Sequence, residues 1–171
     1  YSSLDTQILT FCLEGAVGMP AEQYAQEKLW KPLGMEYDAA WCCDRQDGCV
    51  KGYGGLAATA RDLAKLGRLY LNNGVWEGKR LLPEGWTDRI YGRTALFSPW
   101  PNYVQCVWHF YTYEGVQDEA GQRDCYMSGL HGQTVYLDPA SNTMMIRLGE
   151  RRSKMFWPYN VSVLAHMPQK P

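Results

Sequence analysis

The apolar residues of this 171-residue chain follow a helical period in its first half and a strand period in much of its second half. Before residue 92 they recur three or four positions apart, the spacing that places side chains on one side of an α-helix. Between residues 103 and 148, three segments alternate apolar and polar residues or carry short apolar runs bounded by turns, as strands do. This change of period predicts helices followed by an antiparallel sheet, an α+β (mixed α/β) fold.

Capping residues bound the helices predicted in the first half. Ser2 and Asp5 form a Ser-x-x-Asp start, in which the serine oxygen accepts a hydrogen bond from the first turn of a helix. Thr59 and Asp62 repeat this pattern, and Gly74 ends the helix that follows them in a left-handed turn. Helices are therefore predicted over residues 2–18, 20–34, 59–74 and, more briefly, 83–90, with a loop over residues 35–55.

Three strands are predicted in the second half. Alternation over residues 104–110 indicates one strand with a single buried face. Residues 134–138 and 143–148 form two more, joined through a turn rich in Pro, Ser and Asn. Residues 156–167 have helical spacing with Pro158 in the first turn. The prediction is a three-stranded antiparallel sheet with a terminal helix covering it.

Composition and charge narrow the class of protein. With 46% apolar residues, the chain is expected to form one compact domain over residues 1–171, mainly helical over 1–92, with strands and a terminal helix over 103–171. The formal net charge is −1 and the basic residues are scattered, so no nucleic-acid partner is expected. No apolar run approaches the ~20 residues that a membrane span needs, so none is expected. The compartment, bacterial cytoplasm or periplasm, stays open.

The six cysteines are expected to be free, buried thiols, because a chain of this size does not need disulfides to hold its core. The cluster of Cys42, Cys43 and Cys49 is a weak zinc candidate. No Cys-x-x-Cys occurs, and the three histidines do not lie at metal-ligand spacing from the cysteines. No metal or other cofactor is expected.

Short motifs spread over most of the chain resemble those of the β-lactamase-related serine hydrolases, the group that includes penicillin-binding proteins and class C β-lactamases. They occur in the order of that group: Tyr-Ser-Ser at 1–3, Pro-Leu-Gly-Met at 32–35, Gly-Gly-Leu at 54–56, Gly-Leu-His-Gly-Gln at 129–133 and Asp-Pro at 138–139. Within the group, the chain is similar to 6-aminohexanoate-dimer hydrolases and related esterases. The resemblance implies helices packed on an antiparallel sheet, with an active site between the sheet and a helical region.

The nucleophile motif of that group, Ser-x-x-Lys, is absent, since no serine here has a lysine three residues later. The resemblance therefore implies the C-terminal part of such a hydrolase, with the N-terminal portion of the fold and the nucleophile outside this chain. We expect the parent protein to cleave ester or small amide bonds through an acyl-enzyme, and the isolated chain to be inactive. The expected partners are a small-molecule ester or amide substrate and the missing N-terminal part of the same protein.

Two segments carry the site residues that the resemblance implies. Tyr1 matches the catalytic tyrosine that relays protons between the serine and the leaving group, a role that needs a nearby cation to lower its ordinary pKa of ~10. Ser3 stands where many relatives carry an asparagine that contacts substrate. Gly132 matches a glycine against which substrate lies, which makes the N–H of Gln133 the oxyanion donor. An alternative alignment shifts that donor to Thr134.

Two further residues keep alternative interpretations open. His131 stands near the position of a lysine in β-lactamases, and it either orients substrate or is a structural histidine bound to backbone. Trp41, in the loop over residues 35–55, either lines an acyl pocket or belongs to the core. Because histidine and glutamine replace the fixed cation suited to a penicillin carboxylate, esters and small amides are favoured as substrates.

Two other functions are compatible with the same motifs. A domain that keeps the fold and has lost the nucleophile would be a non-catalytic binding or interaction domain. A parent that does recognise penicillins would be a carboxypeptidase or a β-lactamase. A parent protein that contains Ser-x-x-Lys would be an enzyme, and one that lacks it would be the binding or interaction domain. A preference for penicillins over esters and small amides would identify the carboxypeptidase or β-lactamase.

Overall fold

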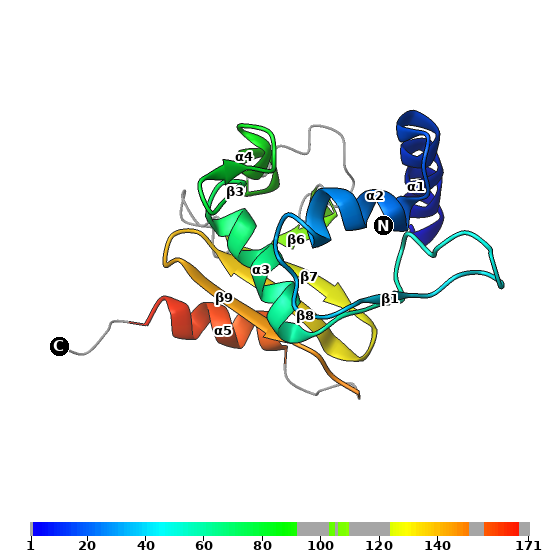
Figure 1. Cartoon of the computed structure of the whole chain (residues 1–171). Coiled ribbons are helices and arrows are strands. Elements are labelled where there is room, and N and C mark those ends of the chain that lie inside the picture. Colours follow the sequence, from blue (N-terminus) through cyan, green and yellow to red (C-terminus); the bar gives the residue numbers. More distant parts are fainter. Residues whose placement is uncertain (1, 92–102, 105, 110–123, 151–155, 168–171) are drawn as a thin grey trace. The chain divides into compact units, whose positions relative to one another are not determined.

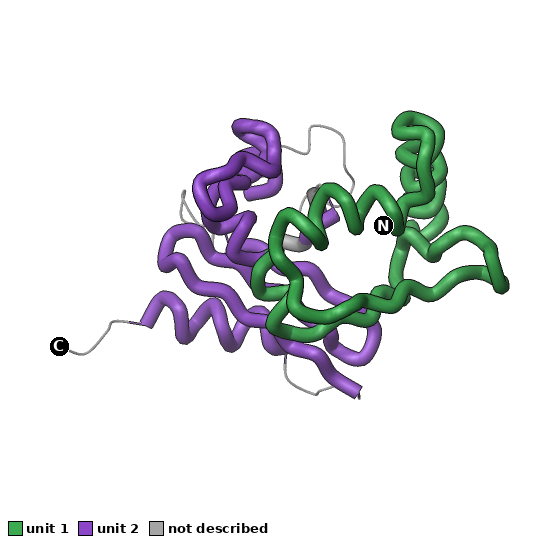
Figure 2. The backbone as a smooth tube through the Cα atoms, in the orientation of Figure 1, with its two compact units in different colours: residues 1–66 green, residues 67–171 purple. Residues whose placement is uncertain are grey.

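The computed structural model describes residues 2–91, 103–104, 106–109, 124–150 and 156–167. The order of helices and strands is shown in Figure 1. The chain divides into two compact units, Tyr1–Leu66 and Gly67–Pro171 (Figure 2), and the boundary falls inside the helix α3 (Ala60–Leu71).

The first unit begins with the predicted helix α1 (Ser3–Val17). The Ser2 hydroxyl oxygen accepts a hydrogen bond of 3.4 Å from the backbone N–H of Asp5, which confirms the predicted cap. Gly18 ends the helix with a φ of 69°, a conformation open to glycine at little cost. The second predicted helix is also confirmed: α2 (Ala21–Ala25) continues as one π-helical segment, η1 (Gln26–Trp30).

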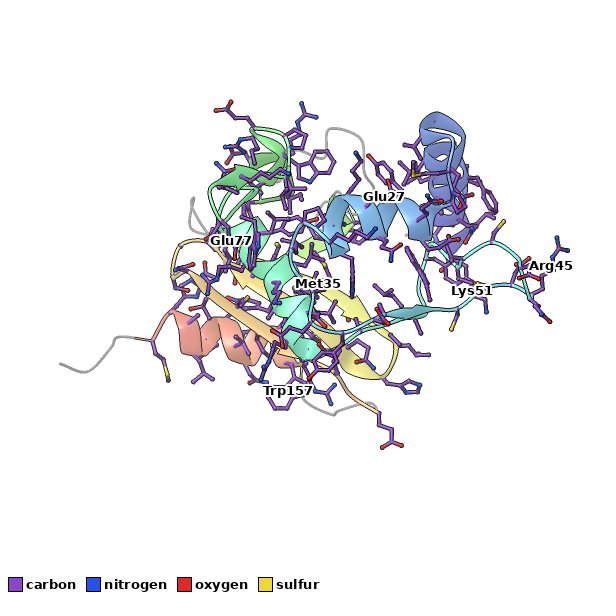
Figure 3. All side chains as sticks on the ribbon, viewed as in Figure 1. Glu27, Met35, Arg45, Lys51, Glu77 and Trp157 are labelled. Atoms are coloured by element: carbon purple, nitrogen blue, oxygen red, sulfur yellow. The ribbon has the colours of Figure 1, made fainter. Side chains whose placement is uncertain are left out.

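The segment predicted as a loop over residues 35–55 contains a short strand, β1 (Ala40–Trp41), and then a hairpin-like excursion, residues 42–55, that leads to β2 (Leu56–Ala57). β1 pairs antiparallel with β2, so the loop prediction was wrong for residues 40–41. Cys43 and Val50 form an isolated antiparallel bridge further along, and Arg45 lies at the tip of this excursion (Figure 3). A two-residue strand is too short to produce a period, and its pairing partner lies 15 residues away in the sequence.

Helix α3 has the predicted start. The Thr59 hydroxyl accepts a hydrogen bond from the backbone N–H of Asp62 at 3.1 Å and donates one to the Asp62 carboxylate at 2.8 Å. The other carboxylate oxygen of Asp62 accepts from the backbone N–H of Glu36 at 2.7 Å. At the end of the helix, Gly74 has a φ of 76° and donates to the Leu69 carbonyl at 2.8 Å, the expected left-handed turn.

The second unit continues with a small hairpin, β3 (Val75–Trp76) and β4 (Lys79–Arg80), and the predicted short helix, α4 (Trp86–Tyr91). Its main feature is a five-stranded antiparallel sheet with the strands in sequence order (Figure 1). The strands are β5 (Tyr103–Val104), β6 (Val107–His109), β7 (Cys125–Gly129), β8 (Gln133–Asp138) and β9 (Thr143–Arg147).

The sheet therefore corrects two predictions. The single strand expected over residues 104–110 is a tight hairpin, in which Val104 pairs with Val107 and Cys106 takes a φ of 65°. Strand β7 was not predicted. With the split of the predicted strand into β5 and β6, the sheet has five strands in place of the expected three. The hairpin of β8 and β9 is confirmed, with Asp138 opposite Thr143 across the predicted turn.

The core of the second unit lies where α3 and α4 meet the sheet. Its buried cluster comprises Ile90, Tyr91, Val107, Cys125 and Leu137. Gly67 lets α3 approach the sheet closely, because a Cβ there would lie 3.1 Å from the Met144 sulfur. The terminal helix α5 (Trp157–Ala165) packs on β8 with Pro158 in its first turn, as predicted.

All six cysteines are free, as predicted, but only Cys125 is buried. The expectation of buried thiols was wrong for the other five, because three of them lie in the exposed excursion after β1 and the others on a helix surface and in a tight turn. None of the helices among the described residues is long and apolar enough to cross a bilayer.

Candidate active site

The turn between β7 and β8 holds three of the predicted site residues. β7 ends at Gly129, the short helical turn η3 (Leu130–Gly132) follows, and β8 begins at Gln133. His131 has a φ of 64° and Gly132 a φ of 80°. A left-handed conformation costs a non-glycine residue about 1–2 kcal/mol, so neighbouring groups must fix it. The structure thus brings His131, Gly132 and Gln133 together in one strained turn.

The His131 ring lies on the surface of this turn. The side chain is exposed, and its ring has no hydrogen bond or ion pair with any residue that the structure describes. Its backbone carbonyl does have a partner, since it accepts from Arg147 at 3.3 Å. The imidazole is therefore accessible to a ligand, while the backbone carbonyl of His131 is held by Arg147.

The side chain of Gln133 has a structural role that no motif predicted. Its Nε2 donates to the Gly149 carbonyl at 2.5 Å, and its Oε1 accepts from the Gly149 backbone N–H at 2.8 Å. The side-chain N–H and oxygen of Gln133 are thereby both paired, with the backbone carbonyl and N–H of Gly149, a residue beyond the end of β9. This pair fixes the start of β8, and only the strand register brings the two residues together.

Arg147 is a second residue of this turn that sequence reasoning missed. It is the last residue of β9, and its Nη1 donates to the Gly132 carbonyl at 2.5 Å. No sequence motif marks it, because an arginine at the end of a strand is common on protein surfaces.

Three predicted site residues belong to the first unit. Ser3 is the exposed first residue of α1, next to the capping Ser2. Trp41 is half-buried in β1, and its Nε1 donates to the carbonyls of Lys51 at 3.0 Å and Gly54 at 3.1 Å. The indole N–H thus ties β1 to the returning part of the chain, residues 51–54, which leads back to β2. Tyr1 lies outside the described residues.

The buried thiol of Cys125 is unsuited to nucleophilic chemistry. Burial, followed by the nearby carboxylates of Asp124 and Asp138, raises its pKa to about 12. The thiol therefore stays protonated near neutral pH, where only a thiolate attacks efficiently. Over the part of the chain that the structure describes, no group of three His, Cys, Asp or Glu side chains is arranged to hold a metal ion.

Comparison with known proteins places these features in a family. Residues 1–157 match the family model described as Beta-lactamase. The 6-aminohexanoate-dimer hydrolase of Paenarthrobacter ureafaciens is 30% identical over 159 residues, an alignment that covers 86% of this chain and 38% of that enzyme.

Solved structures share the fold. A protein from Bacillus anthracis assigned as a 6-aminohexanoate-dimer hydrolase superposes with a TM-score of 0.76 at 24% identity, covering 97% of this chain and 42% of its own. A β-lactamase from Mycobacterium bovis superposes with a TM-score of 0.68 at 17% identity, covering 96% of this chain and 63% of its own. These likenesses confirm the predicted fold of helices and antiparallel sheet.

The chain spans less than half the length of the two 6-aminohexanoate-dimer hydrolase relatives. The match to the family nevertheless extends over most of the chain, from the Tyr-Ser-Ser segment through the turn before β8 to the start of α5. The chain belongs to the β-lactamase family.

Proposed function

We propose that this chain is part of a serine hydrolase that cleaves ester or small amide bonds through an acyl-enzyme. In this proposal Tyr1 relays protons, and the turn of Leu130–Gly132 with Gln133 binds the substrate and the developing oxyanion. The serine and lysine of Ser-x-x-Lys are supplied by polypeptide outside this sequence, because the motif does not occur within it.

The observation that carries the proposal is the turn between β7 and β8 in a member of this family. Leu130 and His131 are exposed, Gly132 and Gln133 are half-buried, and His131 and Gly132 have left-handed backbone conformations. Backbone N–H groups in a fixed turn need no reorganisation when negative charge develops, which is the property of an effective oxyanion hole.

The register of the sheet favours Gln133 over Thr134 as the oxyanion donor. Thr134 is buried and pairs with Ser128 on one side and Arg147 on the other. Gln133 stands at the end of the β7–β8 ladder, where its register partner is Gly129, and on the β9 side it is bound through its side chain to Gly149. A donor at the end of a ladder is closer to an incoming ligand than one enclosed between two strands.

The accessible ring of His131 supports a substrate-orienting role rather than a structural one. An imidazole can bind the polar end of an ester or amide by hydrogen bonding, whereas a penicillin carboxylate is best bound by a fixed cation. The proposal therefore ranks uncharged esters and linear amides above cephalosporins. The relative from Paenarthrobacter ureafaciens carries the name 6-aminohexanoate-dimer hydrolase, which supports this ranking.

The surface of α1 supports a further part of the proposal, that other polypeptide of the same enzyme covers this helix. Gln7 binds the Val50 carbonyl at 3.2 Å and the Gly52 N–H at 2.9 Å, and Glu14 accepts from the Ala21 N–H at 3.0 Å. The polar side thus faces its own unit. Apolar side chains point outward, with exposed fractions of 68% for Leu4, 50% for Ile8, 61% for Leu9, 49% for Phe11 and 39% for Leu13.

This arrangement is the reverse of a surface helix, whose apolar side faces the core. No residue of α1 is buried. A contiguous apolar helix surface is typical of an interface or of a helix enclosed by further layers of the same fold. Since the relatives are more than twice as long as this chain, the second arrangement is the one that we propose.

The test is to express the complete gene product and to measure kcat/KM on a p-nitrophenyl ester, a linear aminohexanoate amide and a chromogenic cephalosporin. We expect the ester or the amide to be preferred, and the isolated 171-residue chain to turn over none of them. Preference for the cephalosporin by more than about tenfold, ~1.4 kcal/mol in transition-state binding, would contradict the assignment of the His131 turn. Saturable turnover by the isolated chain would contradict the location of the nucleophile.

A further inference from the structure

We propose that Arg147 is a positioning residue, which holds the turn between β7 and β8 and strengthens the N–H of Gln133 as a hydrogen-bond donor. The part that concerns the donor rests on the proposed function. Arg147 stands at the end of β9, so it acts from a strand that carries none of the family motifs.

One guanidinium nitrogen contacts the backbone carbonyls of both left-handed residues of the turn. Arg147 Nη1 donates to the carbonyl of Gly132 at 2.5 Å and lies 3.3 Å from the carbonyl of His131. These are the residues with φ values of 80° and 64°. Hydrogen bonds from a charged donor are roughly twice as strong as neutral ones, so they help to hold the turn and offset part of the cost of the left-handed conformation of His131.

The guanidinium is itself held in place. Its central carbon lies 5.6 Å from the ring centroid of Trp157, which begins α5 and is labelled in Figure 3. This is the distance of a cation–π contact. Arg147 therefore joins the end of β9, the turn before β8 and the start of α5.

Two glycines leave room for the guanidinium. A Cβ at Gly132 would lie 2.7 Å from Nη1 of Arg147, and a Cβ at Gly149 would collide with the same group. Gly149 has no left-handed φ, so backbone conformation does not explain a glycine there, whereas the space needed by the arginine does. Gly149 is also the residue bound by both polar groups of the Gln133 side chain.

The charge of Arg147 acts on the donor through the peptide group. The carbonyl of Gly132 and the N–H of Gln133 belong to one peptide unit, whose resonance couples the oxygen to the nitrogen. A cation bound to the oxygen draws electron density from the nitrogen and makes the N–H a stronger donor, as in chains of polarised hydrogen bonds. An oxyanion that forms at this N–H is therefore stabilised more than one at an unbound peptide.

The first experiment measures amide hydrogen exchange in the 171-residue chain. Arg147→Met removes the guanidinium, and Gly149→Ala leaves it present but displaces it. We expect both variants to accelerate exchange at residues 131 and 132 by about tenfold or more relative to residues 135–137 of β8. Arg68→Met is the matched control, because Arg68 binds Asn142 at 2.8 Å, in the turn at the opposite end of β8.

Unchanged exchange at residues 131 and 132 in both variants overturns the positioning role. If one variant fails to fold, the other decides, and Arg147→Lys supplies a third case that keeps the charge without the planar guanidinium. A uniform increase over the whole sheet in both variants also overturns it, since that result indicates a general structural role.

The second experiment uses the complete gene product and a p-nitrophenyl ester. Arg147→Met is expected to lower kcat at least tenfold with KM nearly unchanged, because a stronger donor acts on the oxyanion and little on the neutral substrate. Arg68→Met is expected to leave both constants at the wild-type values. Equal kcat in wild type and Arg147→Met overturns the effect on the donor. If the wild-type product does not hydrolyse the ester at all, the proposed function is overturned, and with it the effect of Arg147 on the Gln133 donor. The exchange result then decides the positioning role by itself.

Discussion

Ser162, in the middle of α5, donates a hydrogen bond of 2.8 Å to the Asp124 carboxylate just ahead of β7. The same carboxylate oxygen accepts from the Tyr136 hydroxyl on β8 at 3.0 Å, and all three side chains are buried. Burial and the charge of Asp124 raise the pKa of Tyr136, so its hydroxyl remains a donor throughout the working range of pH. One buried acidic residue thus joins the terminal helix to two strands of the sheet.

Removing one of these donors is expected to destabilise the second unit. Ser162→Ala removes one of the two donors that the described residues supply to the buried Asp124 carboxylate, which costs about 1–3 kcal/mol of unfolding free energy. Ser128→Ala is the matched control, because Ser128 is exposed on β7. Urea denaturation followed by circular dichroism measures both. Equal midpoints for the two variants would show that the hydrogen bond contributes nothing measurable.

Gln133→Ala is expected to loosen the connection between β8 and the chain beyond β9. The amide at Gly149 loses its acceptor, so its hydrogen exchange should accelerate by about tenfold, equivalent to ~1.4 kcal/mol of local opening. Gln23→Ala is the control, since Gln23 lies on an exposed helix surface and its side chain donates to Glu27 in the first unit. Gly149 exchange that is the same in wild type and Gln133→Ala would contradict the structural role of this side chain.

The stability of the first unit is expected to fall in acid through Asp62. Burial raises the pKa of this carboxyl, but donors from Glu36, Thr59 and the Tyr37 backbone, with the charge of Lys65, outweigh it, so its pKa lies below the ordinary 3.8. Its contribution is complete above the unfolded pKa and is lost as pH falls through the lower folded value.

Denaturation of wild type and Asp62→Asn between pH 2 and 7 tests this dependence. The difference in stability should be largest near neutral pH and should shrink towards pH 2. Asp38→Asn, at an exposed position of the same unit, is the control and should track wild type. A difference that stays constant with pH would mean that the charge of Asp62 is not what stabilises the helix start.

The outward apolar side of α1 is expected to make the isolated chain self-associate. Sedimentation velocity over a range of concentrations should show species larger than a monomer, and Ile8→Lys with Phe11→Lys should reduce them. Tyr37→Lys is the control, because Tyr37 is 59% exposed in the same unit but lies outside α1. A wild-type chain that stays monomeric at high concentration would count against an apolar interface on this helix.

The elements that sequence predicted well are those fixed by local chemistry. A capping serine or threonine, three residues ahead of an aspartate, sets the start of α1 and of α3, and a left-handed glycine ends each of them. These interactions join residues close in sequence, so they leave a pattern that can be recognised without the fold.

The elements that it missed depend on partners distant in sequence. β7 reads Cys-Tyr-Met-Ser-Gly, which has no clear alternation, and it becomes a strand because β8 pairs with it along its whole length. The hairpin at Cys106 was hidden because its two short strands continue one alternating pattern. The contacts of Gln133 and Arg147 likewise follow from register, although the glycine and glutamine of the turn were identified from the sequence.

The most direct test of the proposed mechanism is the effect of Tyr1→Phe on ester hydrolysis by the complete gene product. The substitution removes one hydroxyl and keeps the aromatic ring, so binding of the ester should change little. Loss of a proton relay predicts a fall in kcat of about 10²–10⁴-fold, with KM close to the wild-type value. A Tyr1→Phe enzyme with wild-type kcat would contradict the proposal that this chain contributes the catalytic tyrosine of a serine hydrolase.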